Sequence, residues 1–93
     1  MCETASVTVI ISNKLGLHAR PAMLFVEAAN GFACDIGVRR TDQSETVDGK
    51  SIMQMMMLAA TQGTKLVLKA KGSDATEAIN ALKQLVERKF DEE

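Results

Sequence analysis

Hydrophobic positions along the 93 residues change their spacing several times, which predicts strands that alternate with helices. Alternation with period two is typical of half-buried strands, whereas apolar residues three and four positions apart are typical of amphipathic helices. The alternating segments are Ala5 to Ser12, Phe32 to Arg40, Glu45 to Asp48 and Lys65 to Ala70. The helical segments are Ala19 to Asn30, a short one over Ile52 to Leu58, and a long one that starts at Ala75 and ends near Phe90.

The ends of the predicted helices carry residues that typically begin or stop a helix. Pro21 suits the first turn of its helix, where the backbone N–H has no partner, and Gly31 suits the position just after that helix. Ser51 is the expected N-cap of the short helix. Asp74, with Glu77 three residues later, predicts a capping box at the start of the last helix.

The predicted order of elements is β-α-β-β-α-β-α. This order indicates the α+β class, in particular an open-faced β-sandwich with three helices on one face of a four-stranded antiparallel sheet. The other face must tolerate water, and Ser6, Thr8, Lys65 and Lys69 suit it. The length fits one domain over residues 1–93 with one hydrophobic core.

Composition argues against several classes of protein. Hydrophobic residues make up 46% and charged residues 25%, which is typical of a globular chain rather than a disordered one. A net charge of −1 and three Phe without Trp or Tyr argue against nucleic-acid binding. The most apolar stretch, residues 51–60, is too short to cross a membrane, and residues 1–10 do not resemble a secretory signal. Cys2 and Cys34 form no disulfide framework, so we expect a reduced cytoplasmic protein.

The only histidine, His18, lies where a loop containing Gly16 meets the predicted helix at Ala19. A helix N-terminus presents unpaired N–H groups and a partial positive charge, which together favour a phosphate. Arg20 adds a planar donor fork, and neutral imidazole is a nucleophile near pH 7. These features are compatible with one hypothesis, in which His18 accepts a phosphoryl group whose oxygens are held by Ala19 and Arg20. Gly16 allows the loop to turn closely around the site.

Other interpretations of His18 stay open on the residues alone. A histidine beside an arginine at a helix start is more often a surface residue that caps the helix weakly, so phosphoryl transfer is the less common alternative. A metal site is disfavoured, because no second histidine exists and Cys2 and Cys34 are not spaced as a ligand pair. No cofactor is implied.

The string GLHARPAMLFV, residues 16–26, resembles the active-site segment of the HPr family, the histidine-containing phosphocarriers of the bacterial phosphotransferase system. The resemblance runs through essentially the whole chain and includes DGKSIMQMMMLAATQGT, residues 48–64. It implies that His18 is phosphorylated at Nδ1, that Arg20 is the active-site arginine and that Pro21 shapes the first helical turn. It also implies a carrier without turnover of its own, which enzyme I charges from phosphoenolpyruvate and a IIA-type protein discharges.

The Met-rich segment after Ser51 carries further expectations. One short helix cannot bury all its apolar side chains against one sheet, so we expect Ile52, Met53 and Met56 to stay partly exposed and to dock partners. The plainer interpretation is a short core helix capped by Ser51. In many members of the resembling family an HPr kinase/phosphorylase modifies the matching serine. A phosphate on Ser51 would add about −1.5 to −2 charges to the docking face.

A few short sequence similarities concern the branch of the family. Leu15 before GLH, the string VDGKSIMQMMMLAA and the ending RKFDEE resemble the nitrogen-type (NPr) proteins, which favours a nitrogen-type or multipurpose carrier over a dedicated sugar-transport carrier. An alternative function is a regulatory module that docks through Ser51–Leu58 without phosphoryl transfer, although His18 with Arg20 argues against that as its only role. A structural ferredoxin-like domain leaves the His-X-Arg-Pro string unexplained. We expect a monomer with no nucleic-acid partner and no membrane insertion.

Overall fold

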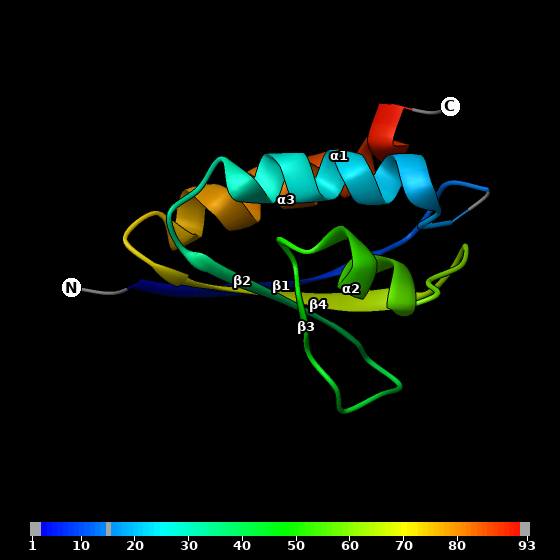
Figure 1. The fold of residues 1–93 in the computed structure, drawn as a ribbon, viewed down its shortest axis with the longest axis horizontal. Coiled ribbons are helices and arrows are strands. Elements are labelled where there is room, and N and C mark those ends of the chain that lie inside the picture. The colour runs from blue at the N-terminus through cyan, green and yellow to red at the C-terminus, as the bar shows by residue number, and fades with distance from the viewer. Residues whose placement is uncertain (1–2, 15, 92–93) are drawn as a thin grey trace.

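The computed structural model describes residues 3–14 and 16–91 and confirms the predicted open-faced arrangement (Figure 1). An antiparallel sheet has the strand order β1-β4-β2-β3, and helices cover one of its faces. The strands are β1 (Glu3–Ile10), β2 (Asp35–Arg40), β3 (Val47–Asp48) and β4 (Lys65–Gly72). The helices are α1 (Ala19–Asn30), α2 (Ile52–Met57) and α3 (Ala75–Glu87), followed by the 3-10 turn η1 (Lys89–Asp91).

The central strand β4 sets the register of the sheet. It pairs with β1 along its whole length, with Ile10 opposite Lys65, and with β2, where Arg40 lies opposite Leu66. Strand β3 pairs with β2 through only two residues, Val47 and Asp48. Because all pairs are antiparallel, the end of β1, the end of β2 and the start of β4 meet at one end of the sheet. The loop before α1 and the segment after α2 lie at that same end, where the Leu17 N–H donates to the Ala60 carbonyl oxygen.

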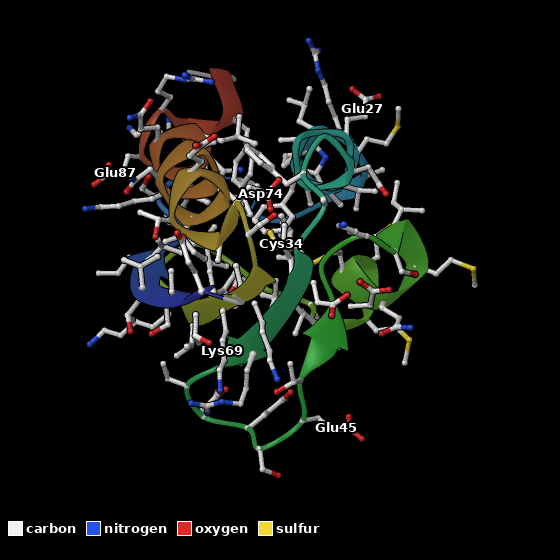
Figure 2. All side chains as sticks on the ribbon, turned by 90° about the vertical axis from the view of Figure 1, so that its left-hand side faces the viewer. Glu27, Cys34, Glu45, Lys69, Asp74 and Glu87 are labelled. Atoms are coloured by element: carbon white, nitrogen blue, oxygen red, sulfur yellow. The ribbon has the colours of Figure 1, made fainter. Side chains whose placement is uncertain are left out.

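The core lies between the sheet and the helices α1 and α3, as the periodicity predicts. In β4, Leu66 and Leu68 are buried while Lys65 and Lys69 are exposed, and Figure 2 shows Lys69 on the side of the sheet away from the helices. Ser6 and Thr8 are exposed on the same open face. The helical residues that complete the core are Ala22, Phe25 and Ala29 of α1, Met55 of α2, and Ala75, Ala78, Ile79, Leu82, Leu85 and Val86 of α3.

Helix α1 begins and ends where the sequence predicts, at Ala19 and Asn30, and Gly31 follows it. The strand predicted from Phe32 begins only at Asp35, because residues 32–34 bend between α1 and the sheet. The strand predicted from Glu45 is reduced to Val47–Asp48, since residues 43–46 are exposed and make no ladder. None of the helices in the described ranges is long and apolar enough to cross a membrane.

The predicted capping box at the start of α3 is wrong. Asp74 occupies the N-cap position, but its side chain makes no capping hydrogen bond. Its carboxylate instead accepts hydrogen bonds from the backbone N–H groups of Ala33 (2.8 Å) and Cys34 (2.9 Å), some 40 residues away in sequence. Figure 2 shows Asp74 beside Cys34, between the start of α3 and the start of β2. The hydrogen bond from Ala33, with those from Cys34, lowers the pKa of Asp74.

Cys34 lies buried at this junction and forms no disulfide. Burial raises the pKa of its thiol, and the neighbouring Asp74 carboxylate raises it further. A buried thiol with a raised pKa holds little thiolate at neutral pH, so Cys34 acts here as a small core residue. The other cysteine, Cys2, lies outside the described residues.

Asp74→Asn is expected to lower the free energy of unfolding at pH 7, because one of two carboxylate acceptors becomes an amide donor. Since the folded pKa is lowered, ionised Asp74 stabilises the fold above its unfolded pKa of about 3.9, and the contribution disappears as the pH falls through the folded pKa. Urea unfolding at several pH values should therefore show that the difference in free energy of unfolding between wild type and variant becomes smaller in acid.

The matched control is Glu77→Gln, which removes the other residue of the predicted capping box. Glu77 is exposed, so this change should alter the free energy of unfolding by at most about 0.5 kcal/mol. A gap between wild type and Asp74→Asn that stays constant from neutral to acid pH would contradict the role given to the carboxylate.

Candidate functional site

A tight turn at Asn13 and Gly16 leads the chain into α1. Asn13 is fully buried, and its side-chain amide donates to the Gly16 carbonyl oxygen at 2.6 Å. The Gly16 N–H donates back to the Asn13 carbonyl oxygen at 3.1 Å. Asn13 did not emerge from the sequence as a site residue, although an asparagine three residues before a glycine is typical of turns closed by a side chain.

Gly16 packs against the segment that joins α2 to β4. Its φ is +70°, and a Cβ there would lie 2.5 Å from the Ala60 carbonyl oxygen and 2.8 Å from the Thr61 Cα. The next N–H, that of Leu17, donates to the same Ala60 oxygen at 2.8 Å. The close turn predicted at Gly16 is therefore present, and the structure adds the surface against which the loop rests.

His18 is the N-cap residue of α1, in extended backbone conformation with φ −88° and ψ −168°. Its carbonyl oxygen accepts the Ala22 N–H at 3.0 Å, so the backbone of His18 starts the helix. Its half-buried imidazole makes no capping hydrogen bond, and the interpretation of His18 as a weak side-chain cap is therefore wrong.

The first turn of α1 leaves its backbone donors available for an anion. Pro21 is buried and has no N–H, while the N–H groups of Ala19 and Arg20 make no hydrogen bond within residues 3–14 and 16–91. The Arg20 side chain is exposed, and the first turn contains no acidic residue. Unpaired N–H groups, the positive end of a twelve-residue helix and a guanidinium together suit a phosphate next to His18.

Helix α2 presents methionines to solvent. Met53 and Met56 are 76% and 46% exposed, as the sequence predicts, and Met57, which the sequence does not single out, is 77% exposed. We call these three residues the methionine face. Met56 and Met57 follow Met53 by three and four positions, the spacing that places side chains on one side of a helix. Ile52 is half-buried and packs against the core, so it contributes less surface.

The start of α2 and its neighbour α1 complete this region. Ser51 is the N-cap, and its hydroxyl oxygen accepts the Gln54 N–H at 3.4 Å, which confirms the predicted cap. Helices α1 and α2 pack against each other, and Met23 of α1 is 49% exposed. Within the described ranges, no three His, Cys, Asp or Glu side chains are grouped closely enough to hold a metal ion.

Comparison with known proteins places this geometry in a family. The family profile described as the phosphorylation site of the HPr component of the phosphotransferase system (PTS) matches residues 5–88. The chain belongs to the HPr family. The phosphocarrier protein HPr of Pseudomonas aeruginosa is 49% identical over 87 residues, which cover 94% of this chain and 96% of that one. The phosphocarrier protein NPr of Escherichia coli K12 is 36% identical over 90 residues, covering 97% and 99%.

The fold comparison agrees with the sequence comparison. The crystal structure of HPr from Thermoanaerobacter tengcongensis has a TM-score of 0.89 and 48% identity, covering 96% of this chain and 98% of that one. The resemblance found in the string GLHARPAMLFV and the open-faced α+β fold are thus both confirmed. As an HPr chain, the protein is a phosphocarrier of the phosphotransferase system.

Gly16→Ala is expected to lower the free energy of unfolding by about 3 kcal/mol, because it combines a left-handed backbone with a Cβ too close to the 60–61 backbone. Gly63→Ala is the matched control. Gly63 has φ +92° but open space around its Cβ position, so that variant should lose only about 1 kcal/mol. Urea unfolding of both variants measures the difference, and equal losses would show that the loop does not rest on Ala60 as described.

Proposed function

We propose that His18 accepts a phosphoryl group from enzyme I, itself charged by phosphoenolpyruvate, and passes it to a IIA-type protein. In the first transfer a bond forms between Nδ1 of His18 and phosphorus as the bond from phosphorus to the donor breaks. In the second transfer that new bond breaks as the acceptor binds the phosphorus. The protein ends each cycle unchanged, so it is a carrier between two catalytic partners rather than an enzyme with its own turnover.

The observation that carries this proposal is the only histidine of an HPr chain standing at the N-cap of α1. The unpaired N–H groups of Ala19 and Arg20 supply partial positive charge for the phosphoryl oxygens, and the exposed Arg20 guanidinium supplies a full one. A group held by a few solvent-exposed donors is stabilised without being trapped, which suits transfer in both directions.

We further propose that α2 docks both partners, through Met53 and Met56 with a smaller contribution from Ile52. Flexible, polarizable methionine side chains adapt to differently shaped surfaces, which suits a carrier that must meet a donor and an acceptor in turn. Docking on α2 supports the transfer because the segment that follows α2 contacts the loop before His18. The contact is the hydrogen bond from the Leu17 N–H to the Ala60 carbonyl oxygen. The same geometry makes the regulatory module without phosphoryl transfer the weaker alternative, since it gives His18 and Arg20 no task.

Ser51 is the proposed site of regulation by an HPr kinase/phosphorylase. Its half-buried hydroxyl stands at the start of α2, next to the methionine face. A phosphate there adds about −1.5 to −2 charges beside an apolar docking surface, which opposes binding. The modification is identified as an acid-stable phosphate from ATP that is absent in Ser51→Ala.

The remaining expectations are proposals of the same kind. A reduced cytoplasmic setting agrees with the free buried Cys34, and residues 1–93 are proposed to form one HPr-like domain. The identity of 49% to an HPr and 36% to an NPr favours a multipurpose carrier over the nitrogen-type branch. The expectation of a monomer stays a prediction.

Incubation with phosphoenolpyruvate and enzyme I is expected to add one acid-labile phosphoryl group to the wild-type chain and none to His18→Ala. The reason is that His18 is the only imidazole in the sequence. Intact mass before and after acid treatment measures the gain, and phosphorus-31 NMR assigns the nitrogen. The absence of a gain in the wild type, or an equal gain in His18→Ala, would remove the proposal.

Met53→Glu is expected to weaken binding to enzyme I about tenfold, because it places a charge in the centre of an apolar contact. Titration calorimetry measures the affinity, and circular dichroism checks the fold. Ile10→Glu is the matched control, since Ile10 is 53% exposed but lies at the end of β1 on the open face of the sheet. If both variants bind as tightly as the wild type, Met53 is not part of the interface.

A further inference from the structure

Arg40, the last residue of β2, reaches across to the end of α2. Its Nη1 donates to the carbonyl oxygens of Leu58 at 2.9 Å and Ala59 at 3.2 Å, the two residues that follow the helix. A cation at this position satisfies carbonyl groups that the helix itself leaves unpaired, and it is favoured by the negative end of the helix. The C-terminal end of the docking helix is therefore attached to the sheet by one guanidinium.

Asp42 holds that guanidinium in place. The Arg40 Nε donates to Oδ1 and Nη2 donates to Oδ2 of Asp42, each at 3.0 Å. Two parallel charge-assisted bonds fix the plane of an arginine side chain as well as its position. The hydrogen bond from Arg40 lowers the pKa of Asp42, so the pair stays ionised at neutral pH. The plane of the guanidinium thus leaves Nη1 pointing at α2.

The segment that Arg40 holds also contacts the loop that leads to His18. Ala59 has a φ of +50°, a left-handed conformation that a residue with a side chain adopts at a cost in free energy. The next carbonyl, of Ala60, accepts the Leu17 N–H at 2.8 Å and lies against Gly16. A hydrogen bond at Ala59 therefore steadies the backbone on which the residue before His18 rests.

We propose that Arg40 is a positioning residue of the phosphocarrier site, which fixes the end of the docking helix and the loop of His18 to each other. The inference rests on the proposed function of His18. It follows from a continuous chain of contacts that runs from Asp42 through Arg40 to Ala59, and from Ala60 to Leu17. A partner that docks on α2 then finds His18 at a fixed distance, and displacement of a reacting group by about 1 Å costs up to a hundredfold in rate.

The test compares Arg40→Gln with Arg39→Gln. Arg39 is the neighbouring arginine of β2, and its Nη1 donates to the carbonyl oxygens of Arg40 (3.2 Å) and Gln43 (2.9 Å) rather than to the segment after α2. In Arg40→Gln the Leu17 amide should exchange with solvent about tenfold faster, and the rate of phosphoryl transfer from enzyme I should fall about tenfold. Arg39→Gln should change both by less than about twofold.

Two further variants separate positioning from general destabilisation. Arg40→Lys keeps a donor for the carbonyl groups but not the paired bonds to Asp42, so it should restore part of the transfer rate, and Asp42→Asn should lose part of it. The Leu68 amide, in the buried central strand, is the internal reference. Exchange that rises equally at Leu17 and Leu68 in Arg40→Gln would reduce Arg40 to a general stabiliser and overturn the inference.

Failure of the inference and failure of the proposed function give different results. A wild-type chain that accepts no phosphoryl group removes the function, while Leu17 exchange still reports on the contact. A wild type that is phosphorylated, beside an Arg40→Gln variant with unchanged transfer rate, overturns the positioning role alone.

Discussion

The hydrogen bond from the Leu17 N–H to the Ala60 carbonyl oxygen joins the two halves of the proposed site. On one side lie the turn at Gly16 and the start of α1, where His18 stands as the N-cap residue. On the other side the chain leaves α2 and enters the central strand β4. Because Gly16 leaves no room for a Cβ at this contact, the loop can approach only with a glycine at that position. The location of the imidazole relative to the methionine face depends on this contact.

The sheet supports this junction by bringing the ends of three strands together. The antiparallel pairing of β4 with both β1 and β2 places the ends of those strands beside the start of β4. From there the Ile11 N–H donates to Thr64 and the Gly63 N–H donates to Ile11, so the loop after β1 and the loop before β4 are tied as well. A phosphocarrier gains from such a scaffold, since it must present one group in the same place to two different partners.

The bounds of helix α1 were predictable from the sequence, whereas the side-chain contacts of Asp74 were not. The bounds of α1 were predictable because apolar side chains at every third or fourth position must face one core, and that constraint is local. The predicted capping box at Asp74 was wrong because its two carboxylate oxygens accept hydrogen bonds across the fold, from the backbone N–H groups of Ala33 and Cys34. No residue spacing along the chain predicts a hydrogen-bond partner 40 positions away. For Asn13 the sequence offers only the general preference of asparagine for turns, and for Arg40 it offers nothing, because a residue at a strand end does not indicate which helix its side chain contacts.

By itself, then, the sequence determined the order of elements, the buried and wet faces of the sheet, and a histidine with an arginine at the start of a helix. These follow from periodicity and from local backbone chemistry, which act over a few residues. Only the tertiary structure decided what the His18 loop rests on, which methionines stay exposed, and that Arg40 connects β2 with the end of α2. Those features depend on which segments the sheet brings side by side, and that choice belongs to the packing of the whole chain.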